Sequence, residues 1–343
     1  MPTYNGGAYV EAALGSLCAQ EERDFEVIAV DDGSADDTPG ILERCAERLP
    51  LKIVRRAHTG NWVAGTNVGM GLAQGRYLCW LHQDDLWCAG RAAHLKRLVS
   101  QWPEAVLFLQ PAWYIDAAGK RVGCWRPPLP RRSGPVPSEL VRGRLLVQDF
   151  LAASAPAFQA EAARRMGGMD ERLWYAGDWD FWLKLGSAGP VVYDPLPRVA
   201  FRLHRESQTW TRTGCREEMV EQHRIVLSRH IGSCALRGLS EKRLRRVATF
   251  SADLNIALMR LAAGAAEGWG RLGWDFVRLG PWGWRTFFRD SRILDRVASR
   301  LRAGLAQADA SPAVGVEHEA RTVVDAAVPT TPDPLFAVRP RES

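Results

Sequence analysis

The first 110 residues alternate short apolar segments with amphipathic segments, and this pattern constrains the fold more than any other feature of the sequence. Short apolar stretches predict strands, and apolar residues that recur every three or four positions predict helices. The predicted strands are residues 25–30, 51–54, 76–81 and 105–109, and the predicted helices are residues 8–20, 38–48, 61–74 and 90–101. Such an alternation is typical of an α/β fold in which helices cover both faces of a mostly parallel sheet.

The N-terminus departs from this alternation. A turn-rich loop, residues 1–7, leads directly into the first predicted helix, whereas a strand should precede such a loop in a β/α unit. We therefore expect that the first strand of the sheet is missing from this sequence. A chain that simply begins with a helix is the alternative.

Composition and charge divide the rest of the chain. Residues 111–150 are rich in Pro, Arg and Gly and are predicted to be mainly loop. Helices are then predicted at residues 160–166 and 178–186, and strands at residues 191–193 and 198–203. Together with the first 110 residues, these elements form one predicted α/β domain over residues 1–213.

The last third of the chain is predicted to be a basic helical extension and a tail. Residues 215–302 hold 17 Lys and Arg against nine Asp and Glu, whereas the whole chain has a net charge of only +6. Their pattern is helical, and the extension is assigned to residues 214–304. Residues 305–343 contain five prolines and few large apolar side chains, so a disordered tail is expected there.

The cysteines and the hydropathy limit where the protein can work. The seven cysteines are an odd number without a Cys-x-x-Cys pair, which argues against a disulfide framework or a thiolate zinc site and fits a reducing compartment. The start of the chain lacks the pattern of a signal peptide, and no uncharged apolar run is long enough to span a bilayer. We expect a cytoplasmic location.

Two acidic pairs follow two of the predicted strands. Asp31 and Asp32 come directly after residues 25–30, and Asp84 and Asp85 come shortly after residues 76–81. Because the carboxyl ends of parallel strands line the ligand crevice of an open sheet, both pairs are expected at one site. Adjacent carboxylates suit Mg²⁺ or Mn²⁺ holding a diphosphate. Turn formation and helix capping remain the alternative for either pair taken alone.

A third acidic motif lies among aromatic side chains at residues 174–185. Asp180 is expected to pair with Lys184 one helical turn later. Asp178 lies at a predicted helix start and is either a helix cap or a partly desolvated carboxylate. The second reading makes it a candidate general base.

In their order along the chain, these motifs resemble those of the family 2 glycosyltransferases, which have the GT-A fold. The resemblance covers about residues 1–213 and rests on five motifs. They are Pro2-Thr3-Tyr4-Asn5, Asp31-Asp32-Gly33-Ser34, Asn67 in a Gly-rich helix, Gln83-Asp84-Asp85 and Gly177-Asp178-Trp179-Asp180. It implies a Rossmann-like GT-A sheet, a nucleotide-sugar donor, a divalent metal and inversion at the anomeric carbon.

The resemblance also implies which residues bind the donor. Tyr4 would stack on the base, Asp32 would form a hydrogen bond with the base, and Asp84 would hold the ribose. Pro2 and Asn67 belong to the same predicted nucleotide-sugar site.

The remaining roles concern the metal and the reaction. By resemblance, Asp85 would ligate Mg²⁺ or Mn²⁺ and Asp178 would deprotonate the acceptor hydroxyl. His204 lies in a His-x-x-Ser segment and is either a further metal ligand or a loop histidine near the acceptor. Two positions depart from the family pattern, because His82 replaces the first Asp of Asp-x-Asp-Asp and Gly177 replaces the Glu that often precedes the catalytic Asp.

The basic extension suggests a membrane surface as a partner. Trp and Arg side chains mixed on amphipathic helices are typical of segments that lie at an anionic membrane interface, although tryptophans at helical spacing also occur in protein cores. No nucleic-acid-binding module accompanies the charge, so no nucleic-acid partner is expected. A peripheral position on the inner face of the membrane would suit a lipid-linked or carbohydrate acceptor.

The sequence therefore predicts a metal-dependent, inverting glycosyltransferase of surface polysaccharide or glycolipid synthesis. A sugar-nucleotide nucleotidyltransferase is one alternative, since it can share this architecture and a carboxylate-bound metal. A catalytically degenerate relative with a scaffold role is the other.

Overall fold

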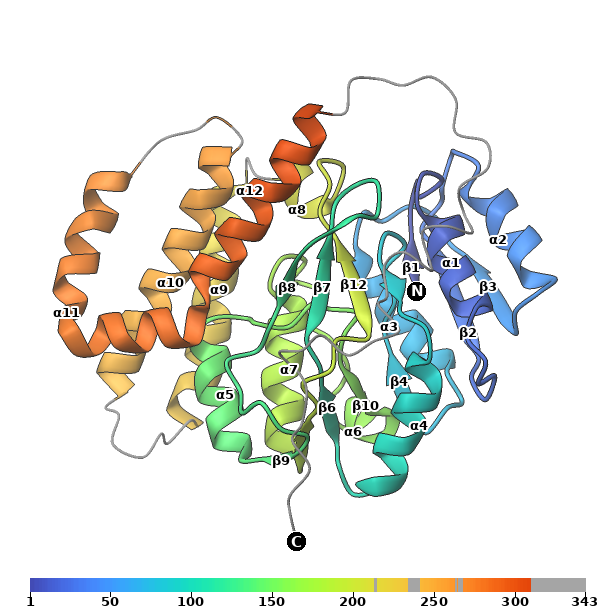
Figure 1. Cartoon of the computed structure of the whole chain (residues 1–343), viewed down its shortest axis with the longest axis horizontal. Helices are drawn as coiled ribbons and strands as arrows, with labels where there is room; N and C mark the ends of the chain where they lie inside the picture. The colour runs from blue at the N-terminus through green and yellow to red at the C-terminus, as the bar shows by residue number, and fades with distance from the viewer. Residues whose placement is uncertain (213–214, 234–240, 263, 265–267, 310–343) are drawn as a thin grey trace, which may run out of the picture.

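The computed structural model describes residues 1–212, 215–233, 241–262, 264 and 268–309. Most of its strands lie in the middle of the molecule, with the C-terminal helices on one side and the N-terminal helices, together with the first strands, on the other (Figure 1). The predicted disordered tail, residues 305–343, lies largely outside the described residues. The division into residues 1–213, 214–304 and 305–343 stays a prediction.

Twelve strands are assigned in the described chain. They are β1 (Pro2–Thr3), β2 (Val27–Asp31), β3 (Leu51–Arg55), β4 (Tyr77–Cys79), β5 (Leu86–Trp87), β6 (Leu107–Leu109), β7 (Ala112–Ile115), β8 (Arg121–Trp125), β9 (Gly134–Val136), β10 (Ala157–Gln159), β11 (Val191–Tyr193) and β12 (Val199–Arg202). They form three ladders, in the orders β1-β2-β3, β4-β10-β6-β11-β9 and β5-β12-β7-β8.

The pairing is less parallel than the sequence predicts. The first ladder is parallel throughout, as are the pairs β6–β11 and β7–β12. Strand β10 runs antiparallel to both of its neighbours, and β5, β8 and β9 are also antiparallel to theirs. The α/β class is confirmed, but the sheet is mixed.

The helices cover this sheet and extend beyond it. They are α1 (Val10–Cys18), α2 (Thr38–Ala46), α3 (Trp62–Leu72), α4 (Arg91–Gln101), α5 (Ser138–Val147), α6 (Ala160–Arg165), α7 (Gly177–Ala188), α8 (Gln208–Thr211), α9 (Arg216–His230), α10 (Glu241–Ala262), α11 (Trp269–Ser291) and α12 (Ile293–Asp309), with a 3₁₀ turn at Ile231–Ser233. The predicted elements of the α/β part agree with these to within a few residues at their ends.

Two local predictions are wrong. Residues 111–150 are not mainly loop, because they contain β7, β8, β9 and α5. The segment's prolines and glycines lie largely between these elements or on β9, where Gly134 and Pro135 pair with β11. Residues 1–7 are not all loop either, because Pro2 and Thr3 pair in parallel with Val30 and Asp31 of β2.

Helix α7 is the centre of the main core. Phe181 and Trp182 are fully buried on it and contact Trp80 and Phe158 in an aromatic cluster. Asp180, also fully buried, forms the predicted ion pair with Lys184, at 2.7 Å. Since the core holds the body of α7 in place, the start of the helix has a fixed position.

The C-terminal helices pack onto the α/β part rather than standing apart. Helix α10 contacts α5, α9 and α11, and α12 lies along β8. Helix α11 is kinked at Gly280, whose φ is +66°, followed by Pro281. No helix in the described ranges is both long enough and apolar enough to cross a bilayer.

Candidate active site

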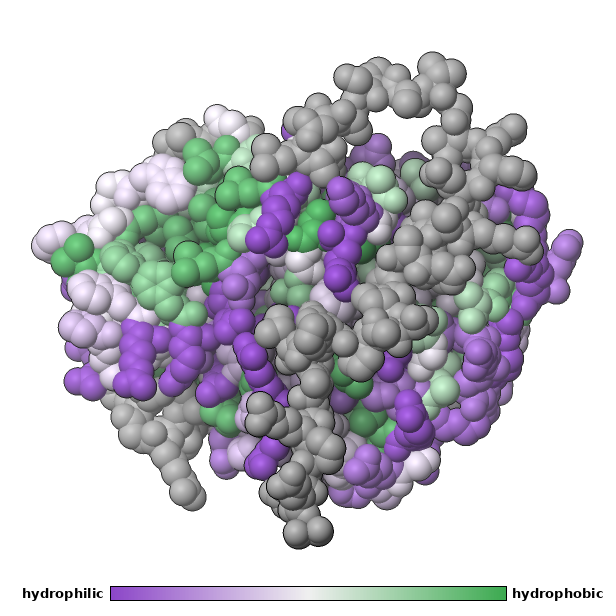
Figure 2. Space-filling view, in the orientation of Figure 1, coloured by the Kyte–Doolittle hydropathy of each residue, from purple (hydrophilic) through white to green (hydrophobic). Residues whose placement is uncertain are grey.

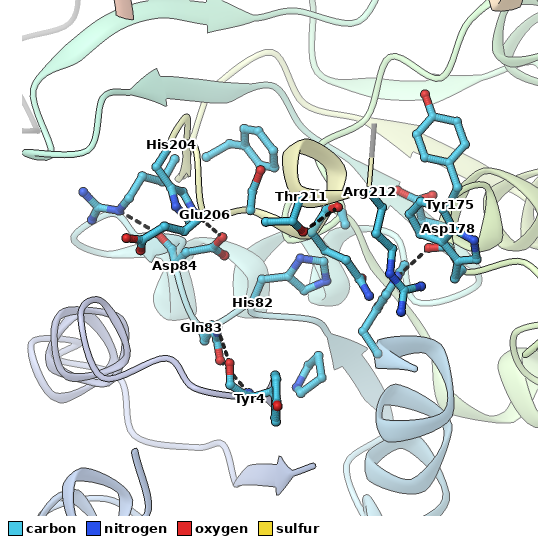
Figure 3. Close-up of a pocket in the computed structure, with 18 of the residues that line it drawn as sticks. Tyr4, His82, Gln83, Asp84, Tyr175, Asp178, His204, Glu206, Thr211 and Arg212 are labelled. Carbon is cyan, nitrogen blue, oxygen red and sulfur yellow. Dashed lines mark hydrogen bonds and ion pairs between the residues drawn. The ribbon is translucent and has the colours of Figure 1, made fainter. Parts of the chain in front are cut away.

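A cavity of about 640 Å³ lies where the three ladders meet the C-terminal helices. Its walls come from the ends of β1 and β2, the loop before β5, the start of α7, the segment after β12, and helices α10 and α12. Figure 3 separates two groups of lining residues. We call the part around Tyr4, Asp84 and His204 the Asp84 half and the part around Tyr175 and Asp178 the Asp178 half. Asp32 belongs to the first half through His58, which contacts both Asp32 and Tyr4, and Asp149 belongs to the second through its interaction with Asp178.

Tyr4 is held at the entrance of the Asp84 half by its backbone. Its N–H donates to Gln83 Oε1 at 2.8 Å, and Gln83 Nε2 donates to the Tyr4 carbonyl at 3.0 Å. The ring is 42% exposed and stacks on His58 with ring centroids 4.0 Å apart. A Cβ at position 6 would lie 2.4 Å from Gln83 Oε1, which is why glycine follows this turn. The Tyr4 ring is therefore held in a fixed position and remains accessible to a ligand.

Asp32 organises the loop opposite Tyr4. Its carboxylate accepts hydrogen bonds from the backbone N–H groups of Thr59 and Gly60, at 2.9 and 2.8 Å, and lies 3.2 Å from Arg56 Nε. Burial raises the pKa of Asp32, but these hydrogen bonds outweigh burial, so the pKa is below its ordinary value. Asp32 is thus ionised, and Pro2 lines the cavity beside it.

The second acidic pair divides between the cavity and the interior. Asp84 lines the cavity, and its Oδ2 lies 2.8 Å from Nε2 of the buried His204. Asp85 is fully buried and does not line the cavity, because its two oxygens accept hydrogen bonds from the Ser154 hydroxyl (2.6 Å) and the Arg202 N–H (3.0 Å). Burial and the charge of Asp84 raise the pKa of Asp85 well above its usual range.

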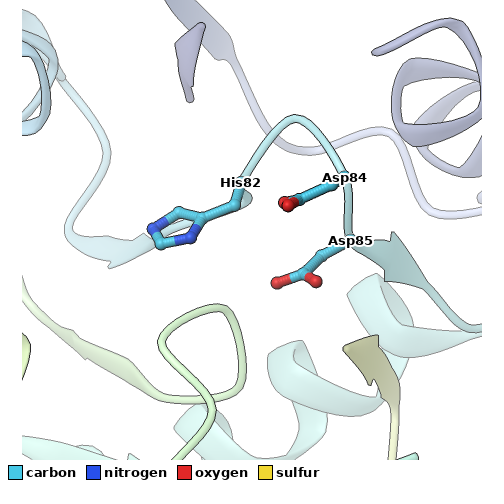
Figure 4. Close-up of side chains that lie close together, drawn as sticks. All are labelled: His82, Asp84 and Asp85. Atoms are coloured by element: carbon cyan, nitrogen blue, oxygen red, sulfur yellow. The ribbon is translucent and has the colours of Figure 1, made fainter. Parts of the chain in front are cut away.

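A metal ion fits between these groups. One ligand atom each of His82, Asp84 and Asp85 lie within 4.8 Å of one another (Figure 4). His82 Nε2 is buried and has no hydrogen-bond partner in the described part of the chain. Two carboxylates with one imidazole form a donor set that suits Mn²⁺ or Mg²⁺ better than a thiophilic metal.

The Asp178 half contains carboxyl groups with raised pKa values. Asp178 is half-buried in the first turn of α7, and its Oδ1 accepts the N–H of Trp179 at 2.9 Å. Burial raises the pKa of Asp178 to about 6. Asp149 lies nearby in the cavity wall, and burial followed by the charge of Asp178 raises its pKa well above the ordinary value. A carboxylate with a pKa near 6 can accept a proton at neutral pH.

The glycine before Asp178 has a packing reason. A Cβ at position 177 would lie 3.1 Å from Val63 Cγ2 and 3.3 Å from Met169 Cε. The start of α7 therefore lies close to α3, and a Glu side chain at this position would have to displace both neighbours. This close contact is a physical reason for Gly177 in place of the Glu that often precedes the catalytic Asp in the family.

Asn67, like Asp85, is a predicted site residue that does not line the cavity. Its Nδ2 donates to the Met169 carbonyl and to Glu171 Oε1, both at 3.0 Å, and its Oδ1 accepts the Met169 N–H. With its amide fully used, Asn67 fixes the segment that precedes α7. It supports the position of Asp178 and is not among the residues that line the cavity.

Several cavity residues were not predicted. Asp149 lies in the segment expected to be loop, and Arg212, Arg296 and Arg300 lie after the last recognised motif or in the extension interpreted as a surface. No local signal in the sequence identifies them. The 4-residue spacing of Arg296 and Arg300 indicates one helix face but does not tell which face is buried.

The comparisons with known proteins agree on family and fold. A family model described as glycosyl transferase family 2 matches residues 1–136. An uncharacterized glycosyltransferase of Rickettsia prowazekii is 25% identical over 227 residues, which are 64% of this chain and 67% of that protein. A relative from Rickettsia conorii with the same description is 26% identical over 60% of this chain, and the alignment spans only 34% of that protein's length.

Among solved structures, residues 1–349 of S. aureus TarS are similar over 90% of both chains, with a TM-score of 0.56 and 18% identity. The structure of the same protein in complex with UDP-GlcNAc gives a TM-score of 0.57 and 17% identity. At this level of identity the likeness establishes the GT-A fold alone.

Proposed function

We propose that this chain, which matches the family 2 glycosyltransferase model over residues 1–136, moves a sugar from a nucleotide-sugar donor to a hydroxyl acceptor, with inversion and with Mg²⁺ or Mn²⁺. The observation that carries this proposal is one cavity with two kinds of carboxylate. Asp84 pairs with His204 beside a candidate metal cluster, and Asp178 has a pKa near 6. The first suits a diphosphate and the second suits an attacking hydroxyl.

In this proposal the Asp84 half binds the donor. Tyr4 offers its exposed face to the base, while Asp32 holds the loop at Thr59 and Gly60 against it. In this proposal Asp84, which lines the cavity, would reach the ion from the cavity, and Asp85, whose oxygens also accept hydrogen bonds from Ser154 and Arg202, would reach it from the interior. When bound, the ion would offset the charge that develops on the leaving diphosphate.

In this proposal the Asp178 half binds the acceptor. Asp178 takes the proton of the acceptor hydroxyl as its oxygen attacks the anomeric carbon from the side opposite the diphosphate. A single displacement of this kind inverts the configuration. The core around α7 and the Asn67 contacts hold Asp178 in place, so orientation adds to the proton transfer.

The test is calorimetric titration with UDP, GDP and dTDP, with and without Mn²⁺, on the wild-type protein and on Asp84→Asn. We expect one nucleotide to bind more tightly with Mn²⁺ and the variant to lose that gain. Equal binding with and without Mn²⁺ would contradict the metal site. Release of a nucleoside diphosphate from the donor supports transfer, release of pyrophosphate would indicate a nucleotidyltransferase, and absence of any donor turnover would favour a scaffold.

We also propose that the C-terminal helices dock on an anionic membrane surface, where a lipid-linked or polysaccharide acceptor is available. Large apolar side chains are exposed on α11 and α12, and Figure 2 shows a hydrophobic area over the C-terminal helices. The exposed side chains are Trp269, Trp274, Val277, Trp282, Phe288, Leu294 and Leu301. This segment is also the basic one, so its charge complements an anionic leaflet. The cytoplasmic, peripheral location follows from this docking.

Co-sedimentation with vesicles tests the docking. We expect binding to vesicles of phosphatidylglycerol and little binding to phosphatidylcholine, with loss of binding in Trp274→Ser combined with Val277→Ser. Arg271 is 80% exposed and pairs with Asp275 on the same helix, so Arg271→Gln indicates how much charge alone contributes. Equal sedimentation with both lipids, or none with either, would contradict the proposal.

A further inference from the structure

A buried guanidinium with two unpaired nitrogens lies in the wall of the cavity. Arg296 of α12 is only 6% exposed, and its Nε and Nη1 atoms have no hydrogen-bond partner among the described residues. The guanidinium lies over the ring of Trp125, with 5.4 Å to the ring centroid. Burial of a charge whose hydrogen bonds are incomplete lowers the stability of the folded protein, so this arrangement of Arg296 costs folding free energy.

The position of Arg296 is set by close packing. A Cβ at position 123 of β8 would lie 2.1 Å from Ser299 Oγ, so glycine is needed there for α12 to approach the strand. Arg302 Nη1 donates to the Val122 carbonyl at 3.2 Å, one further turn along. The Arg296 side chain is therefore held against the cavity by a helix that is fixed against β8 in the turns that follow Arg296.

A second positive charge faces the same space. Arg300 lies one turn after Arg296, lines the cavity and is half-buried. Burial lowers the pKa of Arg296, and the repulsion from the like charge of Arg300, one helical turn away, lowers it further. In the described part of the chain, no carboxylate lies within the 4.0 Å ion-pair distance of either guanidinium. Asp149 is the carboxyl group that faces Arg296, at longer range.

The two arginines belong to the Asp178 half. The groups that influence Arg296 most, besides Arg300, are Tyr114, Tyr175 and Asp149. Neither Asp84 nor Asp32 is among them, and the partners of Asp84 are His82 and His204. In Figure 3, Tyr175 and Asp178 lie on the side of the cavity opposite Tyr4, Gln83 and Asp84. The groups that interact most with Arg296 therefore include the two residues Tyr175 and Asp149 of the Asp178 half and none of the Asp84 half.

We infer that Arg296 and Arg300 form an anion subsite for the acceptor, which would carry a phosphate or carboxylate group near the hydroxyl that Asp178 activates. This inference rests on the proposed function, since it names the acceptor class of the same cavity. A guanidinium offers paired donors in a planar fork that matches phosphate and carboxylate oxygens. The acceptor anion would supply the partners that Nε and Nη1 of Arg296 lack within the protein.

The first test uses glycerol 3-phosphate and glycerol as matched probes. Their binding to the wild-type full chain, Arg296→Gln and Arg300→Gln is measured by ligand-observed NMR, with Arg271→Gln as a control outside the cavity. We expect the wild type and the control to bind glycerol 3-phosphate more tightly than glycerol. Each cavity variant should lose about tenfold or more of that affinity, as the loss of a charged hydrogen bond implies. Equal binding of both probes to the wild type would overturn the inference.

The second test separates the acceptor anion from the donor diphosphate. The affinity of the cavity variants for the nucleoside diphosphate with Mn²⁺ should equal that of the wild type. If Arg296→Gln and Arg300→Gln weaken the nucleotide as much as glycerol 3-phosphate, the arginines serve the donor and the inference is wrong. If the wild type binds glycerol 3-phosphate through the arginines but binds no nucleotide, the proposed function fails while the anion subsite stands.

Stability provides a further readout. Because Arg296 is a buried charge with two nitrogens that lack hydrogen bonds, Arg296→Gln should melt at the same temperature as the wild type or higher. Phosphate should raise the melting temperature of the wild type and not that of Arg296→Gln. A lower melting temperature for Arg296→Gln would mean that the arginine supports the fold. Arg300→Gln, at a half-exposed position, then decides the inference through its affinity for glycerol 3-phosphate.

Discussion

The two halves of the cavity satisfy their polar groups in different ways. In the Asp84 half, Asp32 accepts two backbone hydrogen bonds and forms an ion pair with Arg56. Asp84 pairs with His204. In the Asp178 half, Asp178 accepts only the hydrogen bond of its neighbour Trp179 among the interactions described, and Arg296 has two nitrogens without partners. The carboxylates of the first half are organised before any ligand binds, and His82 Nε2 is the atom left there for an ion, whereas the second half keeps hydrogen-bonding capacity on both its carboxylate and its guanidinium. This difference suits a site that holds one substrate firmly and acts on another.

The substitution expected to separate the halves most strongly is Asp178→Asn. We expect transfer to fall by about 10²–10⁴-fold, the usual contribution of a positioned base. Affinity for the nucleoside diphosphate should stay unchanged, because Asp178 makes no contact with the Asp84 half. Steady-state transfer and calorimetry measure the two effects, and near-normal turnover would refute Asp178 as the base.

His204→Asn should have the converse effect. Since His204 holds the Asp84 carboxylate at 2.8 Å, its loss should weaken Mn²⁺-dependent nucleotide binding by about 10–100-fold, as for other partners of metal ligands. Binding of glycerol 3-phosphate should be unaffected. His58→Asn, which leaves Asp84 untouched, controls for loss of a histidine near Tyr4. Unchanged Mn²⁺ dependence would argue against Asp84 as the ligand.

Acidic pH should distinguish the halves without a mutation. The raised pKa of Asp178, about 6, means that the group is protonated below that pH and cannot accept a proton, so transfer should fall by about tenfold per pH unit below 6. The groups around it are Asp149 and Tyr175, whose pKa values are also raised, so neither gains a charge as the pH falls. Asp32, with its lowered pKa, stays ionised. A pH profile of transfer that is flat between pH 5 and 8 would contradict this prediction.

The smallest expected effect concerns the wall of the Asp178 half. Gly123→Ala places a methyl group against Ser299 and should cost about 1–3 kcal/mol in the free energy of unfolding, as overpacking does. Combining it with Ser299→Gly should restore most of that loss. Denaturant unfolding of the single and double variants measures the recovery. Equal stability of Gly123→Ala and the wild type would mean that α12 does not pack as closely as described.

The difference between the halves also explains what the sequence could predict. Tyr4, Asp32 and Asp84 lie in short motifs at strand ends, where chain order alone brings them to one edge, and all three line the cavity. Asp178 could be predicted as a candidate base because acidic and aromatic residues follow one another in the sequence around it. Asp149, Arg296 and Arg300 belong to distant segments, and only tertiary packing decides that they face the cavity.

Other errors have the same origin. Asn67 was grouped with the donor site because of its motif, but its hydrogen bonds are with Met169 and Glu171, about 100 residues away. Residues 111–150 were predicted to be loop because Pro and Gly obscure the short strands between them. Asp85 follows Asp84 directly in the sequence, but Asp84 pairs with His204 at the cavity whereas Asp85 is buried with Ser154 and Arg202, and these partners come from distant segments.

Helix α12 has an exposed side and a buried side. Leu294 and Leu301 are 71% and 63% exposed on its outer side, whereas Arg296 is enclosed on the inner side. Since a helix of this length moves as one body, a force applied to the outer leucines would displace the guanidinium as well. Contact with a surface and choice of acceptor would then be mechanically linked, and the protein could be selective only where it is attached.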